Sequence, residues 1–456
     1  MRAYERMAAQ DAAFLYFESP TNHMHIGGVL VIEDKGQNVN ALRKHIGSRL
    51  ANAGRLRQRA HEPRRGGGRP VWVDDDGFDI AYHIRPASLP APGGRAELMQ
   101  FVGEVMSESL DRTRPLWELW LVDMPGKTKV IIYKAHHAVV DGIASVELAS
   151  VLLDLSRETA PSPADDWQPA APPSERELFN DAMAERRAMP AKWAGELLQS
   201  IQEPARLRAR ASELRRGLTH LGANALFPAA HSSLTVETCA RRRFATLGVK
   251  LADVVAIKER HGATVNDVVM ALATGGLREL LMSRGEDVTR LELRAAVPVS
   301  TRLVADASSS GNKLAMVFAD LPVYESSATT RLDILQAHMR DLKAGDMVEV
   351  SGTVMQAADD LPAGILSAIG SGLGLQWVMN LTITNIPGPD FPLYCLGGEV
   401  LEIIPYAPLF PRTPLSVSAM SYNGTLKFGI GADWDAMPDL DVLCMGIEKA
   451  LSELGV

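Results

Sequence analysis

The adjacent histidines His136 and His137, followed by Asp141 and Gly142, are the residues of this chain best suited to catalysis. An imidazole can accept a proton near neutral pH, so a well-placed histidine can act as a general base. A single histidine in such a place is more often a structural group, but two of them followed by Asp-Gly at this spacing favour catalysis. Neighbouring side chains on extended backbone point to opposite faces, so only one imidazole is expected to face a given cavity.

The elements that must position these histidines are a strand before them and a helix after them. The apolar run 130–133 predicts a buried strand, and residues 143–153 have the apolar spacing of a helix. Asp141 is suited to be the N-cap of that helix. A second strand over 115–122, joined by a Pro125-Gly126 turn, predicts a hairpin in the sheet that presents the histidines.

Several kinds of chemistry are unsupported because their motifs are absent. The chain has no G-x-S-x-G, no G-x-x-x-x-G-K-[ST] and no H-E-x-x-H, and its glycine run at 66–68 is not followed by a predicted helix. A histidine base without a serine nucleophile close in sequence suits direct transfer, in which an acceptor hydroxyl attacks an activated acyl donor. Such a base contributes a factor of roughly 10²–10⁴ in rate, and a donor to the developing oxyanion is also needed.

Length, charge and cysteine usage restrict the class of protein. A chain of 456 residues exceeds one hydrophobic core, so two domains are expected. The net charge of −8 argues against general nucleic-acid binding. Cys239, Cys395 and Cys444 are far apart, which indicates neither a disulfide framework nor a zinc site. The start of the chain lacks the apolar core of a signal peptide, so we expect a cytoplasmic protein.

Composition shifts divide the chain into three parts. Residues 158–174 are rich in proline and alanine and predict a linker. We therefore expect an N-terminal domain at 1–157, a linker with connecting helices at 158–234 and a C-terminal domain at 235–456. The basic stripe at 206–216 fits either a solvated helix or contact with anionic lipid. The uncharged stretch 361–389 is too rich in glycine and polar residues for a membrane span, so a buried helix to about 378 and then a strand are expected.

Hydrophobic periodicity and capping residues predict the remaining elements. A capped helix is expected to start at Thr264 or Asn266. His23 and His25 fall on one face of a strand, but no third metal ligand lies nearby in sequence, and a surface or packing role is expected. Further helices are predicted at 40–60, 96–110, 175–221, 250–260 and 438–454, and strands at 71–73, 293–302, 311–318, 381–384, 398–404, 416–422 and 425–431.

The histidine motif resembles the H-H-x-x-x-D-G signature of CoA-dependent acyltransferases with the chloramphenicol acetyltransferase-like fold, which include peptide condensation domains. Other stretches are similar to the bacterial wax ester synthase/diacylglycerol acyltransferase family, in the expected order over nearly the whole chain. They are Asp11-Ala12-x-Phe14-Leu15, Met24-His25-Ile26-Gly27, Pro115-Leu116-Trp117-Glu118, Asn266-Asp267, Pro298-Val299-Ser300-Thr301-Arg302, Gly311-Asn312 and Asn385-Ile386-Pro387-Gly388-Pro389.

This resemblance implies an α/β protein of two chloramphenicol acetyltransferase-like domains with mixed sheets, a crossover element, and an active-site tunnel at their interface. His137 would be the general base, while His136 and Asp141 would hold the loop and Gly142 would allow close approach. Asp141 would pair with an arginine, for which Arg302 is a weak candidate. Motif support is expected from Pro115, Leu116, Trp117, Glu118, Asn266, Asp267 and Asn312, and the oxyanion candidates are Asn385, Thr384 and Asn266.

The resemblance also implies acyl-CoA as co-substrate, with no permanently bound cofactor and no metal, and a diacylglycerol or long-chain alcohol as acceptor. Contact with a membrane or lipid droplet would bring the enzyme to such acceptors. Two alternatives stay open. The same base could serve another acceptor, such as a sugar, a polyketide hydroxyl or a carrier-bound amine. The chain could also be a lipid-binding relative without catalysis.

Overall fold

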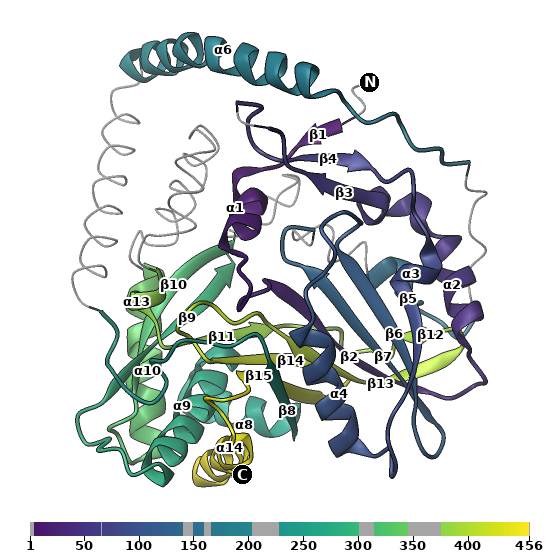
Figure 1. Ribbon diagram of the computed structural model, residues 1–456. Helices are drawn as coiled ribbons and strands as arrows, with labels where there is room; N and C mark the ends of the chain where they lie inside the picture. Colours follow the sequence, from purple (N-terminus) through teal and green to yellow (C-terminus); the bar gives the residue numbers. More distant parts are fainter. Residues whose placement is uncertain are drawn as a thin grey trace.

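The computed structural model describes residues 4–64, 66–139, 149–158, 166–202, 228–300, 314–344 and 375–455. Figure 1 shows two large β-sheets side by side, a small sheet near the N-terminus, and the long helix α6 (Glu175–Gln202) passing across the top. Among the described residues, no helix has the length and apolar character needed to cross a membrane.

The first large sheet has six strands in the order β12-β13-β2-β7-β6-β5. Neighbours in it are antiparallel except the parallel pair β5–β6. Alternate residues of its strands enter two different cores, one with α1 (Ala9–Phe17) and α2 (Val39–Gly47), the other with α4 (Arg95–Ser107). The strands are β2 (His25–Glu33), β5 (Ile84–Ser88), β6 (Trp117–Asp123), β7 (Thr128–His136), β12 (Tyr394–Cys395) and β13 (Gly398–Tyr406).

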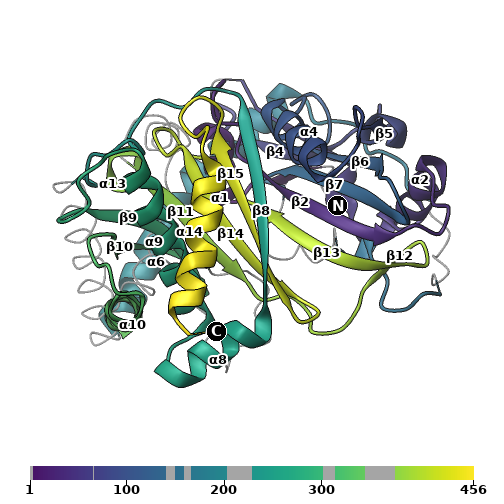
Figure 2. The ribbon, with the colours of Figure 1, turned by 90° about the horizontal axis from the view of Figure 1, so that it is seen from below.

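The second large sheet has the order β10-β9-β11-β14-β15-β8. Its strand β11 is parallel to both neighbours, so both large sheets are mixed, as predicted. Figure 2 shows α14 lying across these strands. The strands are β8 (Arg242–Lys250), β9 (Glu292–Ser300), β10 (Leu314–Pro322), β11 (Leu381–Ile386), β14 (Leu415–Tyr422) and β15 (Thr425–Asp433), and the helices are α8 (Leu251–His261), α9 (Val265–Ser283), α10 (Ala328–Ala344), α13 (Leu375–Val378) and α14 (Leu440–Glu453).

A small sheet of β1 (Tyr4–Arg6), β4 (Val71–Asp74) and β3 (Gln58–His61) holds the beginning of α6. Leu178 of α6 is fully buried against Val71 and Val73. Around this contact, Tyr4 donates a hydrogen bond to Asp181, and the Nε atom of Arg6 lies 3.0 Å from Glu185 Oε1. The helix is thus fixed to the first half of the molecule at its N-terminal end.

Strand β13 joins the two halves of the sequence within one sheet. The division proposed from sequence placed it in the C-terminal unit 235–456, but it pairs with β2 of the first sheet, with Ile404 opposite Val29. In Figure 2 the yellow-green β13 runs beside the purple β2. The pairing covers an edge of β2 that would otherwise expose unpaired backbone groups.

Most predicted elements are confirmed, with one clear exception at 40–60. The helix there ends at Gly47, two short 3₁₀ turns follow (Leu50–Asn52 and Gly54–Arg57), and Gln58 already begins β3. Glycines 47 and 54 interrupt the helical pattern, and cross-strand pairing with β4 stabilises the extended residues. Strand β5, helix α10 and the short helix α3 (Ile80–His83) had no sequence prediction.

Candidate active site

The two motif histidines lie where the central strand β7 ends, and both neighbouring segments hold their backbone. The His136 N–H donates to Leu116 O at 2.9 Å, and the His137 N–H donates to Met24 O at the same distance. Leu116 precedes β6 and Met24 precedes β2, the two strands that flank β7. The backbone of the pair is therefore fixed from both sides of the sheet.

His136 is a buried structural group. Its Nδ1 accepts a hydrogen bond from Ala138 N at 3.0 Å, which closes the turn after the strand. Burial first, and then Arg112 and His137, lower its pKa to about 3. A neutral ring that accepts at Nδ1 carries its proton on Nε2, which lies 3.7 Å from Glu18 Oε2. This geometry suits the loop-holding role that the family resemblance implied.

His137 has a different environment. Its ring is stacked on Phe14 of α1, with centroids 3.8 Å apart and planes inclined by 15°. The side chain is only partly covered, and its Nδ1 is buried with no hydrogen-bond partner among the described residues. Burial lowers the pKa of His137 to about 4. The imidazole is therefore neutral at physiological pH and can accept a proton.

Two further histidines lie behind this pair. His25 is opposite His136 in the β2–β7 register, and its ring is stacked on His23 at 5.3 Å between centroids. Both side chains are buried, and burial is the main cause that lowers the pKa of His23 to about 4 and that of His25 well below its usual value. They pack beside β7, in line with the packing role expected from sequence.

Trp117 and Glu118 form a rigid support next to the histidines. Trp117 is buried, donates from Nε1 to Leu56 O at 2.7 Å and is stacked on His83 at 4.4 Å. Glu118 lies opposite Lys134 on β7, and their charged atoms are 3.3 Å apart. Lys134 also donates to two carbonyl groups near the end of α4. The Pro115-to-Glu118 motif thus connects β6, β7 and α4 next to His136.

The predicted residues of the second half lie in two separate places. Thr264 is the N-cap of α9, and Asp267 completes a capping box by accepting from Thr264 N at 2.8 Å. Asn266 has its Nδ2 atom 3.5 Å from the sulfur of Met270. Thr384 and Asn385 are on β11, opposite Ser418 and Ala419 of β14.

The structure does not bring every candidate together with His137. No hydrogen bond of the described residues joins Asn266, Thr384 or Asn385 to either motif histidine. Four other candidates, Asp141, Gly142, Arg302 and Asn312, lie outside the described residues. Their roles stay predictions.

Comparison with known proteins identifies the family. A model of the wax ester synthase/diacylglycerol acyltransferase catalytic domain matches residues 7–269, and a model of the C-terminal domain of the same family matches residues 310–455. The chain belongs to this family. A probable diacylglycerol O-acyltransferase of Mycobacterium tuberculosis, tgs1, is 32% identical over 451 residues, covering 97% of this chain and 94% of the relative. Another from that species, tgs2, is 30% identical and covers 98% of both.

Solved structures agree with the fold of this wax ester synthase/diacylglycerol acyltransferase member. The enzyme of that name from Marinobacter aquaeolei VT8 has a TM-score of 0.68 at 25% identity and covers 98% of each chain. A starter condensation domain of rhizomide synthetase, solved with C8-CoA, has a TM-score of 0.58 at 15% identity and covers 100% of this chain and 95% of its own. The latter likeness concerns the fold alone. The predicted two-domain α/β architecture is confirmed.

Sequence reasoning gave no role to three residues that shape the site in this family member. Phe14 is stacked on His137, Glu18 faces His136, and Met24 O holds the backbone of His137. Phe14 and Met24 do fall in the two N-terminal stretches that resemble the family. That likeness was the available signal, but sequence spacing could not show that these stretches meet residues more than a hundred positions away.

Proposed function

We propose that the protein transfers a long-chain acyl group from acyl-CoA to a diacylglycerol or a long-chain alcohol, with His137 as general base. As a member of its family the chain is an acyltransferase. The observation that carries the assignment of the base is the geometry of His137, which is neutral, partly covered, stacked on Phe14 and anchored at the end of β7.

The proposed reaction needs only one proton carrier. His137 accepts the proton of the acceptor hydroxyl while the oxygen attacks the thioester carbonyl, which gives a tetrahedral intermediate. The intermediate collapses with cleavage of the C–S bond, and the CoA thiolate takes the proton from His137. The products are an ester and free CoA, and His137 returns to its neutral form. Phe14 keeps the ring plane fixed throughout.

The low pKa of His137 has a consequence for this cycle. A desolvated imidazolium is costly, so the proton leaves readily for the thiolate. The developing oxyanion is negative, and it stabilises the imidazolium during the transition state. We propose Asn385 and Thr384 as candidates for the donor to that oxyanion, and a tunnel between the two halves as the route by which the substrates reach the base.

The test uses purified full-length protein with labelled palmitoyl-CoA and either hexadecanol or a diacylglycerol. Ester formation and thiol release are expected in equal amounts. His137→Ala should lower the rate by a factor of about 10²–10⁴. The exposed His231 supplies the control, because His231→Ala removes an imidazole outside the motif and should leave the rate unchanged. Absence of ester with both acceptors, or full activity in His137→Ala, would refute the proposal.

Acceptor choice is the main alternative within this chemistry. A panel that adds a sugar, a polyketide hydroxyl and a carrier-bound amine separates the lipid acceptors from the others. Binding of acyl-CoA without release of thiol in any of these reactions would instead support a lipid-binding relative without catalysis.

We further propose transient contact with a lipid surface, where such acceptors and products accumulate. The support is the sequence of the basic stripe at 206–216, which lies outside the described residues. Flotation with anionic liposomes tests it, comparing the protein with a variant in which Arg206, Arg208 and Arg210 are changed to Glu. Equal flotation of both proteins would reject this segment as the contact.

A further inference from the structure

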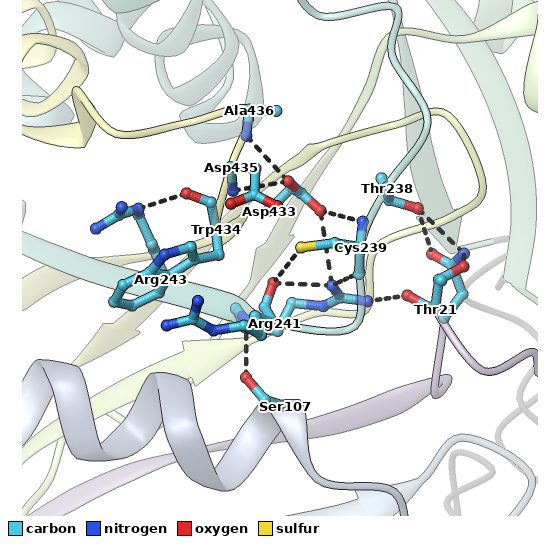
Figure 3. A network of polar contacts seen from close by, with 12 residues as sticks. Thr21, Ser107, Thr238, Cys239, Arg241, Arg243, Asp433, Trp434, Asp435 and Ala436 are labelled. Atoms are coloured by element: carbon cyan, nitrogen blue, oxygen red, sulfur yellow. Dashed lines mark hydrogen bonds and ion pairs between the residues drawn. The ribbon is translucent and has the colours of Figure 1, made fainter.

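A buried arginine of the second half holds the loop that supports the base. We propose that Arg242 is a positioning residue for His137, acting across the interface between the halves through residues 21–25. The inference rests on the proposed role of His137. Arg242 begins β8, and Figure 3 shows four residues that it contacts, Thr21, Ser107, Cys239 and Asp433.

Arg242 bonds to both halves of the molecule. Its side chain is 3% exposed and donates to Thr21 O in the first half and to Cys239 O in its own half. Its backbone N–H donates to Ser107 Oγ at 2.7 Å, at the end of α4. Close to this point, a Cβ placed on Gly103 would lie 2.6 Å from Arg242 O, so α4 and β8 are in direct contact. The guanidinium is therefore held where it meets the loop before β2.

Asp433 balances the charge of Arg242. This carboxylate is 1% exposed, and its Oδ2 lies 4.0 Å from Arg242 Nη1. Cys239 N donates to Oδ2 at 2.6 Å, and the N–H groups of Asp435 and Ala436 donate to Oδ1 at 3.0 Å. Three backbone N–H groups thus fix the carboxylate, and the carboxylate in turn supports the arginine.

The same cluster could suggest a cation site, because ligand atoms of Cys239, Asp433 and Asp435 lie within 4.8 Å of one another. The chemistry argues against that use. Burial and Asp433 raise the pKa of the Cys239 thiol, which donates to Arg241 O at 3.5 Å. The Asp433 oxygens already accept backbone hydrogen bonds, and we assign this carboxylate to Arg242.

A short, tightly bonded loop connects Arg242 to the base. Ser19 and Asn22 exchange two backbone hydrogen bonds of 2.9 and 3.0 Å, which form a compact turn around Thr21. The buried Asn22 side chain donates to Thr238 Oγ1 at 3.2 Å, a second contact with the other half. Two residues later, Met24 has a φ of +49° and presents its carbonyl to His137 N–H.

The loop also connects to the ring of His137. The loop follows directly after α1, and Phe14 of that helix is the stacking partner of the ring. Glu18, the C-cap of α1, faces His136. A shift at Thr21 would therefore move the carbonyl that anchors His137 and the surface on which its ring lies. Misplacement of a catalytic group by about 1 Å can cost on the order of 10² in rate, so the contact at Thr21 is expected to affect turnover.

Arg243 supplies a matched control on the next residue. Its Nε donates to Trp434 O at 2.8 Å, and its guanidinium lies 3.8 Å from the centroid of the Trp434 ring. These side-chain contacts stay within the second half. Arg243→Met thus removes a hydrogen-bonded arginine from the same strand without releasing the loop.

The experiment compares Arg242→Met, Arg242→Lys and Arg243→Met in the full chain. The first readout is amide hydrogen exchange of the peptides that contain residues 19–25 and His137, which requires no turnover. In Arg242→Met, exchange at both places should rise at least about tenfold, with β14 unchanged. The lysine variant should lie between Arg242→Met and the unaltered protein, and Arg243→Met should match the unaltered protein.

The second readout is steady-state kinetics. Arg242→Met should lower kcat by about 10²-fold while KM for acyl-CoA changes less than about threefold, because the base is displaced and not the substrate. Should Arg242→Met fail to fold, the lysine variant carries the comparison. Unchanged exchange at His137 in a folded Arg242 variant, or equal effects in Arg243→Met, would overturn the inference. Exchange that follows the prediction in a protein without ester-forming activity would uphold the coupling and reject the proposed function.

Discussion

At the scale of single residues, the two motif histidines differ in what surrounds them rather than in their chemistry. His136 uses Nδ1 to close a turn and is 1% exposed, whereas the His137 ring is only partly covered and lies on an aromatic face. The backbone alternation of the strand places the two rings in these separate environments. A fully buried histidine and a partly covered one can therefore be adjacent in sequence and still have separate environments.

The buried pair of Glu118 and Lys134, next to the histidines, can be tested by single substitutions. Glu118→Gln should lower the free energy of unfolding by about 3 kcal/mol, because it leaves the buried Lys134 ammonium without its carboxylate partner. The control is at the other end of the same strand pair, where Asp123 faces Lys129 and is 71% exposed. Asp123→Asn should cost less than about 1 kcal/mol. Urea unfolding measures both, and equal losses would contradict the assignment of Glu118 as buried support.

At the scale of elements, the two large sheets approach each other through a glycine. A Cβ placed on Gly429 of β15 would lie 1.7 Å from Pro405 O of β13, closer than any side-chain carbon can come. Tyr406 and Phe244 pack beside this contact at 5.9 Å between ring centroids. The missing side chain thus allows the sheet of one half to meet the sheet of the other.

Gly429→Ala should destabilise the protein by about 2–3 kcal/mol, because the sheets must separate to admit the methyl group. Thermal unfolding and urea titration both measure this loss. Gly54→Ala is the matched control, since nothing lies within 4 Å of the added carbon there. A stability equal to that of the unaltered protein in Gly429→Ala would mean that the sheets are less tightly joined than the structure shows.

The sequence predicts elements well where the signal is local. The alternation at 416–422 and the Thr264 cap before a periodic apolar run both correspond to observed elements, β14 and α9. Strand pairing carries no local signal, so nothing at 398–404 indicated that β13 would join β2. The same reason hides Arg242 and Phe14, whose partners are distant in sequence. The family resemblance proposed His137 as the base, and the folded chain shows which residues hold it.

At the scale of the whole molecule, four neutral histidines that are buried or partly covered tie stability to pH. In the folded state, burial lowers the pKa of His23 and that of His137 to about 4, and that of His136 to about 3. It lowers the pKa of His25 well below the usual value of 6.5. The unfolded chain binds protons at these sites near pH 6.5, and the folded chain does not until the pH is far lower. Acid therefore favours the unfolded state.

Above about pH 7, we expect these histidines to cause no change in the free energy of unfolding. As the pH is lowered from about 6.5 to 4, the free energy of unfolding should fall. Each histidine contributes a slope of about 1.4 kcal/mol per pH unit within that window. His23→Gln should remove the slope of one proton. Urea unfolding measured from pH 4 to 8 compares this variant with the unaltered protein. Identical slopes in both would show that His23 is not buried in its neutral form.

The pairing of β13 with β2 also sets the order in which the protein can be completed during synthesis. Residues that face each other in this pair, such as Val29 and Ile404, are about 370 positions apart. At roughly 5–20 residues per second, the ribosome takes on the order of 20–70 s to make the second partner after the first. During that interval the strand that supports the catalytic histidines has an open edge. A nascent chain of this protein must therefore carry an unfinished active-site sheet for most of its translation, which is the stage at which chaperones and aggregation compete for it.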